Sequence, residues 1–163
     1  MRLEHVMSHD TVTVRPSDTI VECARTMRMR GASSVLVVDE AERLVGILTE
    51  RDLTHKVVAE GLACEGLHVS DFMTANPITA DPLARVWEGA RLMAEHRIRH
   101  LPLIRDGRPV GVVSSDDLSG MEAEPRAPRD VIRGLEESSR EQTLEVPATV
   151  GASDLGEIIP AWY

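Results

Sequence analysis

The sequence predicts a mixed α/β (α+β) fold in which two pseudo-symmetric β-α-β-β-α repeats pack together and a C-terminal extension follows. The first observation is an internal repeat, because Met7 returns as Met73 and Gly46 returns as Gly111. The second is the pattern inside each copy, where short apolar runs of strand length alternate with helical periodicity. One such unit is too small to bury both faces of its sheet, so we expect the two copies to pack on each other.

Each repeat opens with a short strand, expected at 11–14 and at 78–80, that leads into a helix. Apolar residues then recur at i, i+4 and i+7, which places them on one helical face against the core. They are Ile20, Ala24 and Met27 in the first repeat and Val86, Ala90 and Met93 in the second. Cys23 lies on the same face as the first set, and a buried free thiol is the ordinary interpretation.

The ends of these helices carry capping residues. Ser17 or Asp18 is expected to cap the first helix, and Asp81 the second, with Pro82 at the first helical position, where its missing N–H is tolerated. Gly31 should end the first helix. Two further strands are expected in each repeat, at 35–38 and 44–48, and at 101–104 and 110–113.

The same pattern closes both repeats: a glycine, two apolar residues, a hydroxyl, two variable positions and an aspartate. The hydroxyl and aspartate are Thr49 and Asp52 in the first repeat, and Ser114 and Asp117 in the second. A strand that runs into a helix start leaves backbone N–H groups free to meet a polar ligand. The spacing is equally that of a capping box, which satisfies the helix's own N–H groups. Both interpretations stay open at this point.

The composition argues against several classes of function. The formal net charge of −9 disfavours duplex nucleic acid, which requires a basic surface. Phenylalanine, tyrosine and tryptophan make up only 2% of the chain, too few for a platform that stacks single strands. No apolar run is long enough for a membrane span, and the N-terminus lacks the apolar core of a signal peptide. We therefore expect a cytoplasmic protein that binds neither nucleic acid nor membrane.

The residues indicate neither a metal site nor a catalytic site. His5 and His9 have a spacing that would suit metal ligands on a helix, but no helix is indicated there. His96 and His100 share that spacing, but the neighbouring arginines favour an anion over a metal. No nucleophile elbow, P-loop or dinucleotide fingerprint is present, so we do not expect an enzyme.

The paired junction pattern resembles that of tandem CBS domains, which form a Bateman module. The resemblance covers about residues 5–120, and it includes the segment 71–77 (DFMTANP) and the segment 96–103 (HRIRHLPL). It divides the chain into a first CBS repeat at 5–60, a second at 71–120 and an extension at 121–163. The family binds adenosine-containing ligands, such as AMP, ADP, ATP or S-adenosylmethionine, in clefts between the two repeats.

The resemblance also implies roles for individual residues. Asp52 and Asp117 would accept hydrogen bonds from ribose hydroxyls, and Thr49 and Ser114 would donate to phosphate or ribose. Arg99 and His100 stand where such domains often place cations that contact phosphate. The full candidate set for ligand binding is Thr49, Arg51, Asp52, Ile78, Arg99, His100, Ser114 and Asp117.

The two sites are expected to be unequal. Beside the junction aspartate, the first repeat offers Arg51 and the second offers Asp116, and a second carboxylate repels a polyphosphate. The Thr49/Asp52 site is therefore the better candidate for a phosphorylated nucleotide, and the Ser114/Asp117 site is weak or empty.

These features predict a regulatory module that senses an adenine nucleotide (AMP, ADP or ATP) as its ligand, without another cofactor. It would signal to an unidentified regulated protein or to its own oligomer, which we expect to be a homodimer. The alternative is a constitutive dimerisation or scaffold module whose hydroxyl–aspartate pairs only cap helices. We further expect the apolar end of the extension, with Trp162 and Tyr163, to dock on a repeat.

Overall fold

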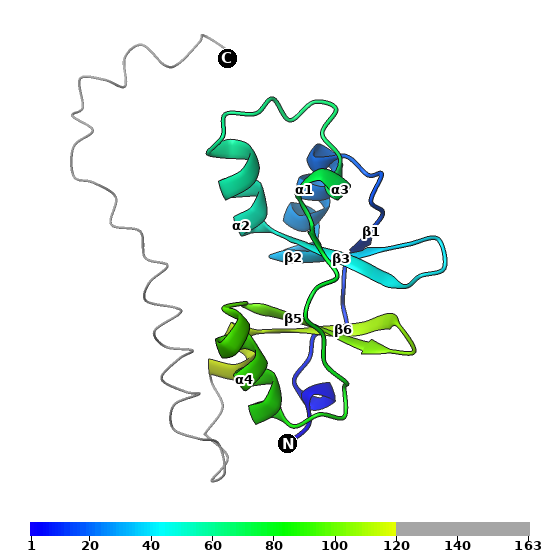
Figure 1. The fold of residues 1–163 in the computed structure, drawn as a ribbon, viewed down its shortest axis with the longest axis vertical. Helices are drawn as coiled ribbons and strands as arrows, with labels where there is room; N and C mark the ends of the chain where they lie inside the picture. Colours follow the sequence, from blue (N-terminus) through cyan, green and yellow to red (C-terminus); the bar gives the residue numbers. More distant parts are fainter. Residues whose placement is uncertain (120–163) are drawn as a thin grey trace, which may run out of the picture.

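The computed structural model describes residues 1–119, and the predictions made for the extension at 121–163 lie outside this part. Two α/β repeats are stacked so that their sheets face each other and their main helices lie on the outer sides (Figure 1). The mixed fold with two packed repeats, predicted from the sequence, is confirmed. The sheets thus form the middle of the molecule, where the ends of their strands meet.

The elements follow the predicted order. The first half of the chain contains η1 (Leu3–His5), β1 (Thr13–Val14), α1 (Ile20–Arg30), β2 (Ser34–Val38), β3 (Leu44–Thr49), α2 (Glu50–Leu53) and the π-helix η2 (Thr54–Val58). The second half contains α3 (Val69–Phe72), β4 (Thr74–Ala75), α4 (Val86–His96), β5 (His100–Arg105), β6 (Arg108–Ser114) and α5 (Ser115–Ser119). One sheet has the order β1-β2-β3-β4, with only the β1–β2 pair parallel, and β5 and β6 form the other as an antiparallel pair.

Each repeat receives the opening segment of the other. Strand β4, which opens the second repeat, pairs with β3 of the first, with Thr74 opposite Ile47. In the same way Ser8 forms an antiparallel bridge to Val112 on β6. The two hydrophobic cores carry the same exchange, because Leu3 is buried in the core of the second repeat and Val69 in that of the first. Neither repeat therefore completes its core with its own opening segment.

The glycines of the repeated pattern permit this exchange. A Cβ atom on Gly46 would lie 2.5 Å from the Sδ of Met73, and one on Gly111 would overlap the Sδ of Met7. Real Cβ atoms do not approach sulfur so closely, so a side chain at either position would push the opening segment away. The glycines and methionines that recur in the sequence therefore contact each other: Gly46 packs against Met73, and Gly111 packs against Met7 in the equivalent way.

The predicted helix starts were wrong in both repeats. Helix α1 begins one residue after Thr19, which forms a capping box with Glu22, whereas Asp18 accepts a hydrogen bond from the backbone N–H of Arg15 at 2.7 Å. Helix α4 begins at Val86 rather than next to Asp81.

The physical reason for the late start of α4 lies in η1. The N–H groups of Leu3 and Glu4 donate to the carbonyls of Ala84 and Pro82, both at 2.9 Å. These carbonyls therefore accept hydrogen bonds from the N-terminal segment instead of from the N–H groups of a helix that would begin at Pro82. The predicted strand at 78–80 is likewise reduced to a single bridge between Ala80 and Leu103.

Other local predictions are confirmed. Gly31 ends α1 in the left-handed conformation, with φ of 60°. Ile20, Met27, Ala90 and Met93 are buried, and the remaining two members of the stripes, Ala24 and Val86, are partly buried. Cys23 is buried as a free thiol, and burial raises its pKa to about 11.

The contact between Gly46 and Met73 makes a testable prediction. Gly46→Ala should destabilise the fold by about 1–3 kcal/mol, because the new methyl group meets the sulfur of the opening segment. In a Met73→Ala background the same change should have less than half this effect, since the obstructing side chain is absent. Urea unfolding of the two single variants and the double variant measures this coupling. Equal effects in both backgrounds would contradict the close contact.

Candidate functional site

A cleft of about 760 Å³ lies between the two repeats, at the end of their sheets. This volume is in the range of sites that bind small molecules and cofactors. Seven of the eight residues predicted for ligand binding line it: Thr49, Arg51, Asp52, Ile78, Arg99, His100 and Ser114. Asp117 is not among its lining residues. The fold therefore gathers nearly the whole candidate set from both repeats into one space.

The first junction is a capping box. The Oγ1 of Thr49 accepts a hydrogen bond from the backbone N–H of Asp52 at 3.2 Å. In return, Oδ2 of Asp52 accepts from the backbone N–H of Thr49 at 2.9 Å and from its hydroxyl at 2.7 Å. The Thr49 hydroxyl thus already donates its hydrogen bond to the Asp52 carboxylate, and it cannot donate to phosphate unless the box opens.

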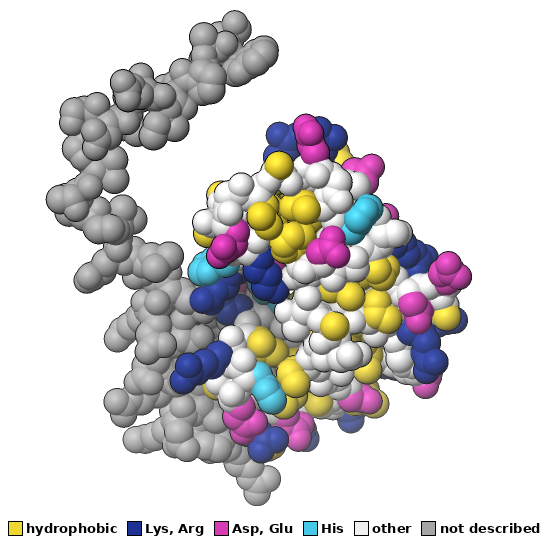
Figure 2. All heavy atoms as spheres, turned by 45° about the horizontal axis from the view of Figure 1, so that its top comes forward, with side chains coloured by type: hydrophobic (Ala, Val, Ile, Leu, Met, Phe, Trp, Pro, Cys, Tyr) yellow, Lys and Arg dark blue, Asp and Glu magenta, His cyan; other side chains and the backbone are white. Residues whose placement is uncertain are grey.

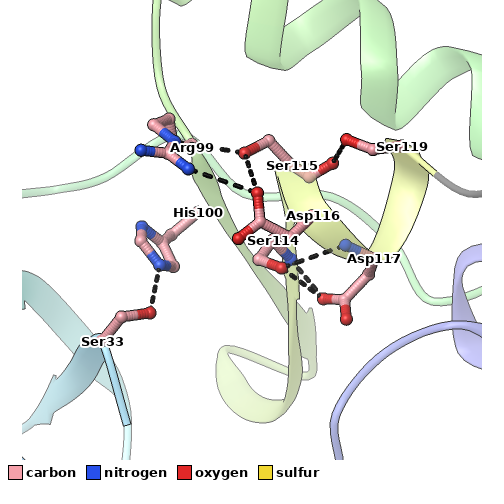
Figure 3. Close-up of polar contacts among 8 residues, drawn as sticks. All are labelled: Ser33, Arg99, His100, Ser114, Ser115, Asp116, Asp117 and Ser119. Carbon is pink, nitrogen blue, oxygen red and sulfur yellow. Dashed lines mark hydrogen bonds and ion pairs between the residues drawn. The ribbon is translucent and has the colours of Figure 1, made fainter. Parts of the chain in front are cut away.

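The second junction repeats this geometry. Oδ2 of Asp117 accepts from both the backbone N–H and the hydroxyl of Ser114 at 2.7 Å, and the N–H of Asp117 donates to the Ser114 hydroxyl at 3.2 Å (Figure 3). The capping interpretation is therefore confirmed at both junctions. In each case it occupies one carboxylate oxygen and leaves the other, Oδ1, for a further partner.

The two outer oxygens differ in their surroundings. Oδ1 of Asp52 lies 2.7 Å from the Nζ of Lys56, and the Asp52 side chain is only 14% exposed. Within residues 1–119, Asp117 has no ion-pair partner. The first junction thus presents a carboxylate that is already held by a cation, on the wall of the cleft.

Arg99 does not stand as an isolated cation. Its Nη2 lies 3.2 Å from Oδ1 of Asp116, and its Nε donates to the Oγ of Ser115 at 3.2 Å (Figure 3). The N–H of Ser115 donates to the Arg99 carbonyl at 2.8 Å, which ties the start of α5 to the segment before β5. The guanidinium therefore offsets the charge of Asp116, the carboxylate expected to weaken binding on this side.

His100 reaches across the cleft to the other repeat. Its Nε2 lies 2.8 Å from the Oγ of Ser33, as Figure 3 shows. Burial and then the charge of Arg99 lower the pKa of His100, and they outweigh the opposing effect of nearby carboxylates, including Asp116. The imidazole is therefore neutral near pH 7 and acts as a hydrogen-bonding group rather than as a cation.

The structure adds lining residues that the sequence interpretation missed. Arg97 follows α4 in the left-handed conformation, with φ of 52°, at the position where the first repeat has Gly31. This departure from the repeat was visible in the sequence. Apolar lining comes from Ile47, Pro77 and Ile98, and polar lining from Ser33, Glu50, Thr74, Asn76, Ser115 and Asp116.

Within residues 1–119, no group of three or more histidine, cysteine, aspartate or glutamate side chains could hold a metal ion. No helix in this part of the chain is both long and apolar enough to cross a membrane.

Comparison with known proteins gives the family. The family model for the CBS domain matches residues 3–59 and 69–122. The chain is 37% identical over 118 residues to an uncharacterised protein of Methanopyrus kandleri, an alignment that covers 72% of this chain and 60% of that relative. The chain thus spans less than two thirds of the length of this relative.

Solved structures agree with this assignment. A CBS domain pair in complex with 5′-methylthioadenosine and S-adenosyl-L-methionine has a TM-score of 0.67 at 29% identity, covering 73% of this chain and 97% of that one. The hexameric CBS-CP12 protein from bloom-forming cyanobacteria has a TM-score of 0.72 at 27% identity, covering 86% of this chain and 79% of that one. The chain contains two matched CBS domains, and its fold agrees with that of solved CBS domain pairs. It therefore belongs to the CBS-domain family, as a tandem pair of CBS repeats.

Proposed function

We propose that this chain is a regulatory module that binds an adenosine-containing ligand (AMP, ADP, ATP or S-adenosylmethionine) in the cleft between its repeats. Binding of the ligand in the cleft then changes the state of a partner protein or of the chain's own oligomer. The observation that carries the proposal is the cleft of about 760 Å³ in which a junction carboxylate, apolar side chains and arginines meet. We assign no catalysed reaction to it.

The lining matches the three parts of such a ligand. Ile47, Ile78 and Ile98 offer apolar surface for a flat base, and no phenylalanine, tyrosine or tryptophan is among the described lining residues. Oδ1 of Asp52 can accept from ribose hydroxyls, because an oxygen of a carboxylate has two lone pairs. Among residues 1–119, Lys56 is the one ion-pair partner of this oxygen. Arg51 and Arg97 also line the cleft and could fork onto phosphate oxygens.

The Asp52 side of the cleft is the proposed ribose site. Asp52 and Arg51 line the cleft, whereas Asp117 does not. Across the cleft, Arg99 is already engaged with Asp116. These contacts support the expectation that the Thr49/Asp52 site is the stronger of the two.

The arrangement also suggests how binding could be read by another protein. A ligand that contacts both repeats favours the relative placement of the repeats in which all its contacts are made. We propose a homodimer as the assembly that responds, and the cyanobacterial relative named as hexameric shows that oligomers occur among proteins of this fold.

A second candidate function is a constitutive scaffold. The observation that favours it is the pair of closed capping boxes, which gives both hydroxyl–aspartate pairs a role in the absence of any ligand. On the face of the described residues in Figure 2, basic and acidic side chains are interspersed, without the continuous basic surface that nucleic acid requires.

The ligand class is tested by thermal unfolding. A ligand at about a hundred times its dissociation constant should stabilise the fold by about 2.7 kcal/mol. For a chain of this length the melting temperature should rise by about 5–10 °C. The panel is AMP, ADP, ATP and S-adenosylmethionine, each up to millimolar concentration. No shift with any of the four would favour the scaffold.

The two junction aspartates give a matched pair of variants. Asp52→Ala and Asp117→Ala each open a capping box, so each should lower the stability of the free protein by about 1 kcal/mol. Only Asp52→Ala should also weaken ligand binding, by about 1.5–3 kcal/mol, because only Asp52 lines the cleft. Calorimetric titration of both variants measures the difference. Equal affinities in the two variants would refute the assignment of the ribose site.

A phosphate beside His100, where the family resemblance places it, would make binding depend on pH. Burial and Arg99 lower its pKa in the free protein, and a bound phosphate would raise that pKa again. Binding of AMP would then take up a proton, so affinity should rise as the pH falls through about 6.5, the ordinary range of histidine. Protonation of the phosphate itself opposes this trend, so the wild type is compared with His100→Asn. The wild type should gain more affinity than the variant between pH 7.5 and about 6. Parallel profiles would place the phosphate away from His100.

A further inference from the structure

The sequence contains a single lysine, Lys56, and seventeen arginines share the remaining basic positions. Lys56 lies on the π-helix η2, four residues after Asp52. Its Nζ lies 2.7 Å from Oδ1 of Asp52 and donates to the carbonyl of Phe72 at 2.8 Å. One ammonium group therefore joins two elements that are far apart in the sequence.

Both elements belong to, or lead into, the lining of the cleft. Asp52 is itself a lining residue. Phe72 ends α3 and is followed by β4 and by Asn76, Pro77 and Ile78, which also line the cleft. Lys56 is not itself among the lining residues. It thus connects Asp52 to the segment before β4 without lining the cleft itself.

The connection bears directly on the oxygen left for a ligand. The capping box occupies Oδ2 of Asp52, so Oδ1 is the oxygen that remains. A cation on one lone pair of Oδ1 fixes the orientation of the carboxylate and leaves the second lone pair for a hydroxyl. The second repeat has no such lysine, because the residue four places after Asp117 is Met121.

We propose that Lys56 is a positioning residue that ties the Asp52 carboxylate to the connection between the repeats. It holds Asp52 and the segment from Thr74 to Ile78 in the mutual placement that a ligand in the cleft requires. The effect on binding rests on the proposed function, whereas the tie between Asp52 and the Phe72 carbonyl does not.

The tie is tested first without a ligand. Lys56→Met removes the ammonium and keeps much of the side-chain length. It should speed amide hydrogen exchange at Met73 to Asn76 by about fivefold, the effect of losing a charged hydrogen bond of modest net strength. Lys56→Arg should restore protection, because a guanidinium can donate to both oxygens. The matched control is Arg91→Met, which removes an exposed ion pair of the same i, i+4 spacing, at 3.7 Å from Glu95 and outside the cleft. Unchanged exchange in Lys56→Met, or the same change in Arg91→Met, would overturn the proposal.

Binding provides the second arm, with AMP and S-adenosylmethionine as probes. If the wild type binds either probe, Lys56→Met should weaken that binding about tenfold, and Lys56→Arg less than threefold. If the wild type binds neither, the proposed function falls, and the exchange experiment alone decides the role of Lys56. Normal affinity in Lys56→Met would show that Asp52 needs no positioning.

The single lysine supplies a readout that a purely structural role would not move. Labelling with lysine carrying ¹³C at Cε gives one side-chain resonance from position 56. This resonance should shift when a probe binds the wild type and should not respond in Asp52→Asn. An unchanged chemical shift of this resonance when a probe binds the wild type would mean that the ligand does not affect the contact between Lys56 and Asp52.

Discussion

The pairing of each opening segment with the last strand of the other repeat is the constraint on which the rest of the structure depends. Strand β4 pairs with β3, and Ser8 pairs with Val112 on β6. Each repeat is thereby joined to the opening segment of the other. Gly46 and Gly111 allow this approach because the methionine sulfurs occupy the space of their missing side chains. The segment that leaves β4 must then cross from one sheet to the other, and its residues form one wall of the cleft.

The junctions show how one small motif can serve both stability and binding. Each hydroxyl–aspartate pair closes a capping box, which satisfies the helix start and fixes one carboxylate oxygen. The other oxygen is then held in a known direction by the same hydrogen bonds. A ligand site built in this way needs no loop to order around it, because the helix start has already ordered its carboxylate. Capping and binding are therefore compatible interpretations, and the surroundings of each junction decide whether both apply.

Much of the fold could be predicted from the sequence because its signals are local and occur twice. The stripes from Ile20 and Val86, the glycine after α1 and the paired junctions all follow from spacing within a few residues. The start of α4 could not be predicted in this way. The carbonyls of Pro82 and Ala84 accept hydrogen bonds from the N–H groups of Glu4 and Leu3, which lie about 80 residues earlier in the sequence.

The same division holds at the site. Thr49, Asp52 and Ser114 were identifiable because they occupy the hydroxyl and aspartate positions of the repeated junction pattern. The place of Asp117 outside the cleft, the bond from His100 to Ser33 and the bridge from Lys56 to Phe72 depend on how distant segments meet. Arg97 lies between these cases, because its substitution for a helix-ending glycine is visible in the repeat but its position in the cleft is not.

The central claim is that one ligand is held between the two repeats with its ribose on Asp52. The most direct measurement is a crystal structure of the protein with whichever adenosine ligand stabilises it most. We predict a ligand in the cleft, in contact with both repeats, with a ribose hydroxyl within hydrogen-bonding distance of Oδ1 of Asp52. A ligand bound outside the cleft, or one whose ribose rests on Asp117 instead of Asp52, would contradict it.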